Sequence, residues 1–177
     1  MPFDQLFSAL DEKKIDAMMS AISITSEREK KFAFSIPYFS STVSFITRKD
    51  HPLDLNQLQD VAVGVGKGST FYNYIQATYG NAVTIKTYDK PDEDIADLAE
   101  GRIDLILLDT PDAKYWVDNS AGQFVFVGKP MDDPKFFGTG FGIGVRQDNV
   151  TLLNAINIAL MNMQKDGTYA AIKKNYF

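Results

Sequence analysis

Hydroxyl side chains and one arginine cluster in a short stretch near the start of the chain. Ser20, Ser23 and Thr25 precede Arg28, where a pattern typical of a strand gives way to that of a helix start. Backbone N–H groups at a helix start and a guanidinium fork both bind carboxylate oxygens. The stretch therefore predicts a site for a small carboxylate, although a plain strand–turn–helix connection with a surface arginine fits the same residues.

A second turn with this character lies at residues 66–70, Gly-Lys-Gly-Ser-Thr, between a predicted strand and a predicted helix. Its spacing matches neither a phosphate-binding loop, which needs Gly-Lys followed directly by Ser or Thr, nor the dinucleotide fingerprint. What remains is a helix start at which Gly68, Ser69 and Thr70 could hold an anion. A glycine-rich turn with Ser/Thr caps is the alternative reading of the same residues.

A lone carboxylate and an aromatic side chain complete the candidate site. Asp109 ends the most apolar strand, and open α/β sheets bind ligands at the carboxyl ends of their strands, although the residue could equally cap the next helix. Phe3 could stack on a ligand or pack in a core. Together the groups match the zwitterion of an α-amino acid. Arg28, Ser23 and the Thr70 turn would hold its carboxylate, and Asp109 would hold its ammonium group.

The composition excludes several classes of function. The net charge of −5 disfavours nucleic acid or an anionic membrane as a partner. The absence of cysteine removes disulfides, cysteine–zinc sites and thiol nucleophiles. The only histidine, His51, lies before Pro52 in a polar loop, which argues against a histidine metal cluster or a Ser–His–Asp triad. We expect no metal site and no cofactor, and no apolar run is long enough for a membrane span.

Strand and helix patterns alternate between residues 60 and 127, which predicts an α/β unit with a largely parallel sheet. The expected strands cover 60–65, 83–88, 103–108 and 124–127, with helices over 71–79 and 92–100 and a third after Asp109. Outside this unit the patterns predict a helix over 4–12 and a strand near 15–19. They also predict a helix start that Thr25 or Ser26 could cap, where Ser26 and Glu29 fit a capping box. They also predict a strand over 40–47, a Gly-studded strand over 136–145 and a helix over 152–165.

The order of motifs resembles the periplasmic solute-binding proteins of polar amino-acid ABC transporters, family 3, in the branch of arginine, lysine–arginine–ornithine and histidine binders. The likeness extends over essentially the whole chain. The matching segments are Phe3-Asp-Gln-Leu, Lys14-Ile-Asp-Ala, Ser23-Ile-Thr-x-x-Arg28, Phe34-Ser-x-Pro-Tyr38, Gly68-Ser-Thr70, Leu98-x-x-Gly-Arg-Ile-Asp104, Asp109, Phe137-Gly-Thr-Gly-Phe-Gly-Ile-Gly-Val145 and Asp166-Gly-Thr-Tyr169.

The resemblance implies an α/β, two-lobe periplasmic-binding-protein-like (type II) fold with the ligand held between the lobes. Lobe 1 would comprise residues 1–39 and 141–177, and lobe 2 residues 40–140. Arg28 would pair with the ligand carboxylate, Asp109 would take the ammonium group and Phe3 would stack on the ligand side chain. The ligand-binding residues implied in full are Phe3, Ser20, Ser23, Arg28, Gly68, Ser69, Thr70 and Asp109.

The chain departs from the family pattern in three places. Ala21 replaces a serine that some relatives have, and Lys67 stands where some carry a neutral residue, so that its charge could repel a cationic ligand. Family members also begin with a strand, a helix and another strand that this sequence lacks. Lobe 1 is therefore expected to be incomplete, as in an N-terminally truncated product that binds ligand weakly or not at all. A partner chain, such as a second copy in a homodimer, could cover the exposed edge.

The function that the resemblance implies is capture of a polar, basic L-amino acid such as arginine or lysine for delivery to an ABC transporter permease. This function involves no chemistry, so the protein is not expected to be an enzyme. It implies the periplasm and a signal peptide, which the sequence from Met1 does not contain. One alternative is a dehydratase-like enzyme on the same fold with Asp109 and Lys67 as the acid–base groups. The other is the ligand-binding lobe of a sensor or receptor.

Overall fold

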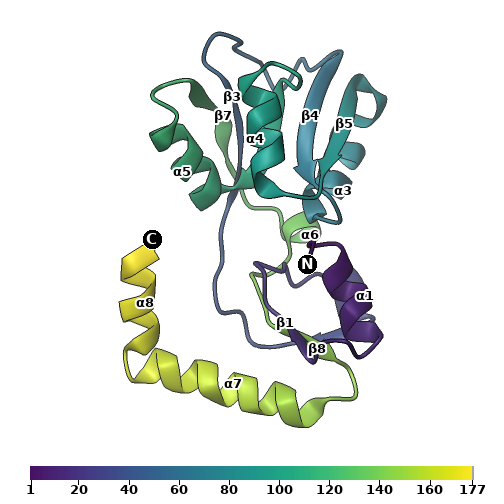
Figure 1. The fold of residues 1–177 in the computed structure, drawn as a ribbon, viewed down its shortest axis with the longest axis vertical. Helices are drawn as coiled ribbons and strands as arrows, with labels where there is room; N and C mark the ends of the chain where they lie inside the picture. Colours follow the sequence, from purple (N-terminus) through teal and green to yellow (C-terminus); the bar gives the residue numbers. More distant parts are fainter. Residues whose placement is uncertain (177) are drawn as a thin grey trace. The chain divides into compact units, whose positions relative to one another are not determined.

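The computed structural model describes residues 1–176, apart from the side chains of Pro91 and Tyr176. Contacts divide the described residues into two units (Figure 1). Unit 1 comprises Met1–Asp4 and Ser41–Phe136, and unit 2 comprises Gln5–Ser40 and residues 137–176. The lobe boundaries implied by the resemblance, at 39/40 and 140/141, stay a prediction.

Unit 1 is built on a five-stranded sheet in the order β5-β4-β6-β3-β7. The strands are β3 (Val43–Arg48), β4 (Val61–Gly66), β5 (Val83–Tyr88), β6 (Leu105–Asp109) and β7 (Phe124–Met131). β4 pairs in parallel with β5 and β6, and β3 pairs antiparallel with β6 and β7, so every strand except β3 runs in one direction. The predicted α/β unit with a largely parallel sheet is confirmed.

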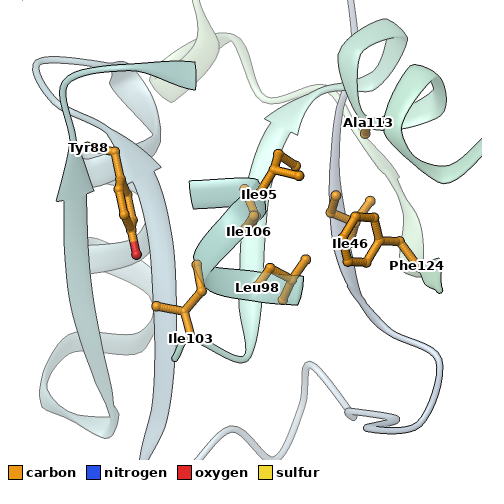
Figure 2. Close-up of a cluster of buried hydrophobic side chains, with 8 residues drawn as sticks. All are labelled: Ile46, Tyr88, Ile95, Leu98, Ile103, Ile106, Ala113 and Phe124. Atoms are coloured by element: carbon orange, nitrogen blue, oxygen red, sulfur yellow. The ribbon is translucent and has the colours of Figure 1, made fainter. Parts of the chain in front are cut away.

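The helices of unit 1 are α3 (Thr70–Tyr79), η1 (Gly80–Ala82), α4 (Pro91–Ala99), α5 (Thr110–Asn119) and α6 (Pro134–Phe137). Apolar side chains of α4 and α5 pack against the strands in a cluster that Figure 2 shows. The backbone of β4 packs closely against the Ile103 side chain here, because a Cβ added to Gly64 would lie 2.6 Å from Ile103 Cδ1. The cluster consists of Ile46, Tyr88, Ile95, Leu98, Ile103, Ile106, Ala113 and Phe124.

Unit 2 has a smaller, three-stranded sheet in the order β1-β8-β2, with β1 (Ala17–Met18) and β2 (Phe32–Phe34) both antiparallel to β8 (Gly144–Arg146). Its helices are α1 (Gln5–Asp11), α2 (Ser26–Glu29), α7 (Val150–Lys165) and α8 (Thr168–Tyr176). On α7 only Leu160 is buried, while Val150, Ile158 and Met161 are exposed.

The structure decides one prediction in unit 2 that the sequence left open, and it overturns another. Of the two possible cap residues, Thr25 caps α2 and Ser26 does not, since the Thr25 Oγ1 accepts the Arg28 N–H at 3.3 Å. The strand predicted over 136–145 begins only at Gly144. Phe137 closes α6, and Gly138 and Gly140 adopt φ values of 74° and 127°, which a strand does not use.

Two kinds of feature are absent from the described residues, namely membrane-spanning helices and clusters of metal-binding side chains. None of their helices is both long and apolar enough to cross a membrane. No group of three or more His, Cys, Asp or Glu side chains among them is arranged to hold a metal ion.

Candidate functional site

One edge of the unit 1 sheet collects several of the predicted ligand-binding residues. β4 and β6 are parallel neighbours, with Val63 opposite Leu105 and Gly64 opposite Ile106. Their carboxyl ends therefore lie at the same edge, where the turn over 66–70 follows β4 and Asp109 ends β6. The structure thus brings Gly68, Ser69 and Thr70 to the same sheet edge as Asp109, the position at which open α/β sheets bind ligands.

The turn before α3 leaves polar groups in unusual surroundings. Ser69 occupies the N-cap position of α3, yet its side chain makes no capping hydrogen bond. Its Oγ is buried and, within the described residues, has no hydrogen-bond partner. A buried hydroxyl without a partner is rare in proteins, and it favours a polar group from a ligand at this turn. Gly68 has φ of 74°, and a Cβ there would lie 3.0 Å from Asp4 Cβ, so this position requires glycine.

Asp109 is the second polar residue at an N-cap position on this edge. Its side chain makes no capping hydrogen bond to α5, so the capping alternative does not account for it. Burial raises the pKa of its carboxyl group to about 7, and the nearby Asp112 adds to the shift. A desolvated carboxylate gains from a cationic partner, as an α-ammonium group would be. The next residue, Thr110, belongs to a cluster of hydroxyls, since its Oγ1 lies 2.7 Å from Thr42 Oγ1 and 2.8 Å from Ser44 Oγ.

Lys67, in the same turn, is held by two carboxylates. Its Nζ lies 3.2 Å from Asp89 Oδ1 and 3.3 Å from Asp4 Oδ2. Hydrogen bonds to the two carboxylates raise the pKa of Lys67, with the larger contribution from Asp89 and the smaller one from Asp4. Sequence reasoning missed both partners. Asp89 follows β5, so the strand-end rule could have found it, whereas nothing in the sequence pairs Asp4 with a turn more than sixty positions away.

In unit 2 the guanidinium of Arg28 is anchored by its own neighbours. Nη1 donates to the Ser23 carbonyl oxygen at 3.0 Å, and Cζ lies 4.9 Å from the centroid of the Phe7 ring. Burial lowers the pKa of Arg28 to about 10, against the opposing effect of Glu27, so the group stays charged at neutral pH. Because α2 has only four residues and Thr25 caps it, attraction for an anion here rests on the guanidinium rather than on a helix dipole.

The remaining predicted residues lie as follows. Ser23 is buried and forms an isolated bridge with Phe141, whereas Ser20 is exposed. Phe3 is partly buried in the Met1–Asp4 segment of unit 1. Ser20, Ser23 and Arg28 therefore belong to unit 2, and the other predicted residues belong to unit 1: Phe3, Gly68, Ser69, Thr70 and Asp109.

The α/β architecture is that of the periplasmic-binding-protein fold. Residues 1–177 match the family of bacterial extracellular solute-binding proteins, family 3, and the chain belongs to that family. Because the family consists of solute-binding proteins, the chain is a transport receptor and not an enzyme, which overturns the dehydratase-like alternative.

Among individual proteins, the chain is similar to ABC transporter arginine-binding protein 1 of Escherichia coli K12, at 35% identity over 99% of this chain and 71% of that protein. It is similar also to the lysine/arginine/ornithine-binding periplasmic protein of the same organism, at 38% identity over 99% of this chain and 69% of the relative. Among solved structures, a periplasmic binding protein of Salmonella typhimurium with high arginine specificity superposes with a TM-score of 0.93. That match has 30% identity and covers 99% of this chain and 78% of the other.

Proposed function

We propose that this protein binds a basic L-amino acid, with L-arginine as the first candidate, and delivers it to the permease of an ABC transporter. The observation that carries the proposal is the sheet edge of unit 1. There a partly buried carboxylate that makes no capping hydrogen bond accompanies a helix start whose buried hydroxyl has no partner among the described residues. The names of the relatives support a basic ligand, since those proteins are described as binding arginine or lysine, arginine and ornithine.

Each end of the amino acid has a proposed partner. Asp109 takes the α-ammonium group, because its desolvated carboxylate is stabilised by a cation. Arg28 takes the α-carboxylate through its guanidinium, which suits two carboxylate oxygens at once. The turn Gly68-Ser69-Thr70 adds N–H and hydroxyl donors to that carboxylate.

Three further residues have supporting functions in this proposal. Ser20 and Ser23 contribute backbone or hydroxyl groups to the ligand. Ser23 also fixes Arg28, because its carbonyl oxygen accepts from the guanidinium at 3.0 Å. Phe3 stacks on the ligand side chain, where an aromatic face favours a guanidinium or ammonium group.

The proposed setting is the periplasm, and the proposed partner is a membrane permease. The description of the family as extracellular and the periplasmic names of relatives support this setting. A second copy of the chain is proposed as a further partner. The exposed apolar side chains of Val150, Ile158 and Met161 on α7 support such an association. Sedimentation that shows only monomer at working concentration would remove the second copy from the proposal.

Isothermal titration calorimetry with a panel of arginine analogues tests the amino-acid site. We expect saturable binding of L-arginine and L-lysine, and at least tenfold weaker binding of agmatine, which lacks the carboxylate, and of N-acetylarginine, which lacks the ammonium group. Absence of saturable heat for every amino acid would contradict the proposal. Micromolar binding of L-arginine would in addition contradict the weak binding expected in the sequence analysis.

A further inference from the structure

The proposed function does not explain the positive charge of Lys67. A lysine in the turn that begins α3 adds a positive charge beside a site proposed for a cationic amino acid. Two charges of like sign repel each other even in bulk water, and more strongly where solvent is excluded. An uncompensated Lys67 would therefore disfavour arginine and lysine relative to neutral amino acids.

The structure shows a compensated lysine instead. Lys67 Nζ lies between Asp89 Oδ1 at 3.2 Å and Asp4 Oδ2 at 3.3 Å, so one positive and two negative charges give the group a net charge of −1. The partners come from two different segments, one after β5 and one from the Met1–Asp4 segment. The backbone also fixes the turn, since the Lys67 N–H donates to the Tyr88 carbonyl oxygen at 2.9 Å.

Asp4 is held in place more firmly than a surface carboxylate. Its side chain is 25% exposed, and its Oδ1 is buried without a hydrogen-bond partner among the described residues. Its Cβ lies against the backbone of Gly68, where a side chain at position 68 would clash. The negative charge of Asp4 is therefore positioned at the turn that is proposed to bind the ligand.

We infer that Asp4, Lys67 and Asp89 form a specificity-determining charge triad, whose net negative charge makes the site at the start of α3 select cationic over neutral amino acids. The inference rests on the proposed function, since it needs an amino acid at this turn. It assigns the three residues an effect through charge rather than through contact with the ligand, so their exchange should change selectivity more than neutral-ligand affinity.

Calorimetry with L-arginine and L-citrulline, its neutral isostere, tests the triad. Asp89→Asn brings the net charge to zero and should weaken arginine about fivefold, while Lys67→Met brings it to −2 and should tighten arginine by a similar factor. Citrulline should change less than twofold in both variants. The fivefold effects should shrink in about 1 M salt, because exposed charges are screened there.

Matched controls come from another ion pair of unit 1, Lys114 and Asp118 on α5, whose Nζ and Oδ2 lie 2.6 Å apart. Lys114→Met and Asp118→Asn change the net charge of the protein equally but should leave both ligands within twofold. A second readout needs no ligand: NMR titration of the Lys67 ammonium should show a lower pKa in Asp89→Asn than in the unsubstituted chain, because a carboxylate partner is gone.

The outcomes distinguish failure of the charge inference from failure of the proposed amino-acid site. If Asp89→Asn weakens arginine and citrulline equally, or the controls act like the triad variants, the charge inference is wrong while the amino-acid site stands. An unsubstituted chain that binds neither ligand contradicts the proposed function and the inference together.

Discussion

The two units differ in how firmly each holds its part of the proposed site. In unit 1, Asp109 ends β6, in which Leu105, Ile106 and Leu107 are each 0% exposed, and the turn before α3 follows the adjacent strand β4. In unit 2, Arg28 lies on a single helical turn beside a sheet of two- and three-residue strands. Stability in a protein follows local burial, so unit 1 should be the more stable scaffold and unit 2 the first to open.

This difference indicates how the two halves of the proposed site keep their geometry. The unit 1 residues are positioned by a core that would have to unfold before they could move. Arg28 is positioned by local contacts, namely the Ser23 carbonyl and the Phe7 ring. We therefore expect substitutions in unit 2 to act mainly by loosening the fold, and substitutions at the unit 1 sheet edge to act mainly on the ligand.

The largest expected effect is on the folding of unit 2. A Cβ on Gly138 would lie 2.1 Å from the Ile24 carbonyl oxygen, and the φ of 74° already disfavours any other residue. Gly138→Ala should therefore destabilise unit 2 by about 4 kcal/mol or more. Gly167→Ala is the control, since Gly167 has a φ of 86° with nothing within 4 Å, and it should cost about 1 kcal/mol.

Urea unfolding followed by amide hydrogen exchange would measure this pair. Protection in unit 2 should fall in Gly138→Ala while the amides of β4 and β6 stay protected. Equal costs for the two alanine substitutions would show that the backbone contact to Ile24 does not hold unit 2 together.

Asp109→Asn tests the proposed ligand-binding edge of the unit 1 sheet. Loss of the charge opposite an ammonium group should weaken L-arginine about a hundredfold, or by about 3 kcal/mol, with little change in the melting temperature. Asp118→Asn, at an exposed position of α5, should leave the affinity within twofold. A stable Asp109→Asn variant with unchanged affinity would remove Asp109 from the site.

The pH dependence of binding sharpens the same test. The carboxyl group of free Asp109 has a pKa of about 7 because of its burial, so it is protonated below that pH, and only the ionised form pairs with an ammonium group. The dissociation constant for L-arginine should therefore rise about tenfold per pH unit below pH 7 and level off above it. In Asp109→Asn this dependence should disappear, as calorimetry between pH 5 and 8 would show.

Substitution of Asp94, a buried residue of α4, should have a smaller effect, which falls on the stability of unit 1 and depends on pH. Its side chain is 2% exposed, and burial raises its pKa to about 7, opposed by its hydrogen bond from the Ile95 N–H and reinforced by Asp92 and Asp97. A raised acid pKa means that the folded state binds the proton more tightly than the unfolded state. Its contribution to stability is therefore present below about pH 4 and is lost as the pH rises to 7.

Asp94→Asn should consequently stabilise the protein by about 2 kcal/mol at pH 8 and by almost nothing at pH 4.

Substitution of Asp97, one turn further along α4, should have the opposite effect on stability. Lys86, the Tyr88 hydroxyl and Arg102 hold its pKa well below the usual range. Asp97→Asn should therefore lower the melting temperature at pH 8. Thermal unfolding of both variants at pH 4 and pH 8 measures these effects. Equal changes in melting temperature for Asp94→Asn and Asp97→Asn would contradict the opposite pKa shifts of the two carboxyl groups.

The smallest effect is expected on the outer face of α7. Ile158 is 54% exposed, so Ile158→Gln should change the free energy of unfolding by less than about 0.5 kcal/mol. Leu160 on the same helix is 8% exposed, and Leu160→Ala should cost about 2 kcal/mol. Should Ile158→Gln destabilise as much as Leu160→Ala, the outer face of α7 is buried in solution, and a sedimentation experiment would identify a second copy as the cause.

The two units were also predictable to different degrees. The strands of unit 1 stood out because both faces of β4 and β6 are covered, which leaves unbroken apolar runs in the sequence. The strand-end rule then located Asp109 and the turn at 66–70. The antiparallel insertion of β3 between β6 and β7 had no local signal, because it depends on pairing between Phe45 and Leu107, far apart in the chain.

Unit 2 was harder because its elements are short and local signals compete. The sequence allowed either Thr25 or Ser26 as the cap of α2, because both residues carry the hydroxyl that a cap needs, and the structure shows that it is Thr25. Gly138 and Gly140 adopt positive φ values that interrupt the strand predicted over 136–145, and no local signal in the sequence predicts that α6 ends at Phe137. The partners of Lys67 were invisible for the same reason as the place of β3, since Asp4 and Asp89 meet it only in the folded unit.

An NMR titration of the labelled chain with L-arginine tests the central claim most directly. The account predicts saturable amide shifts at Gly68–Thr70 and at Asp109 and Thr110 in unit 1, and at Ser23 to Arg28 in unit 2, all with one dissociation constant. Shifts confined to other surfaces, or two groups that titrate independently, would contradict the claim that these residues bind one amino acid.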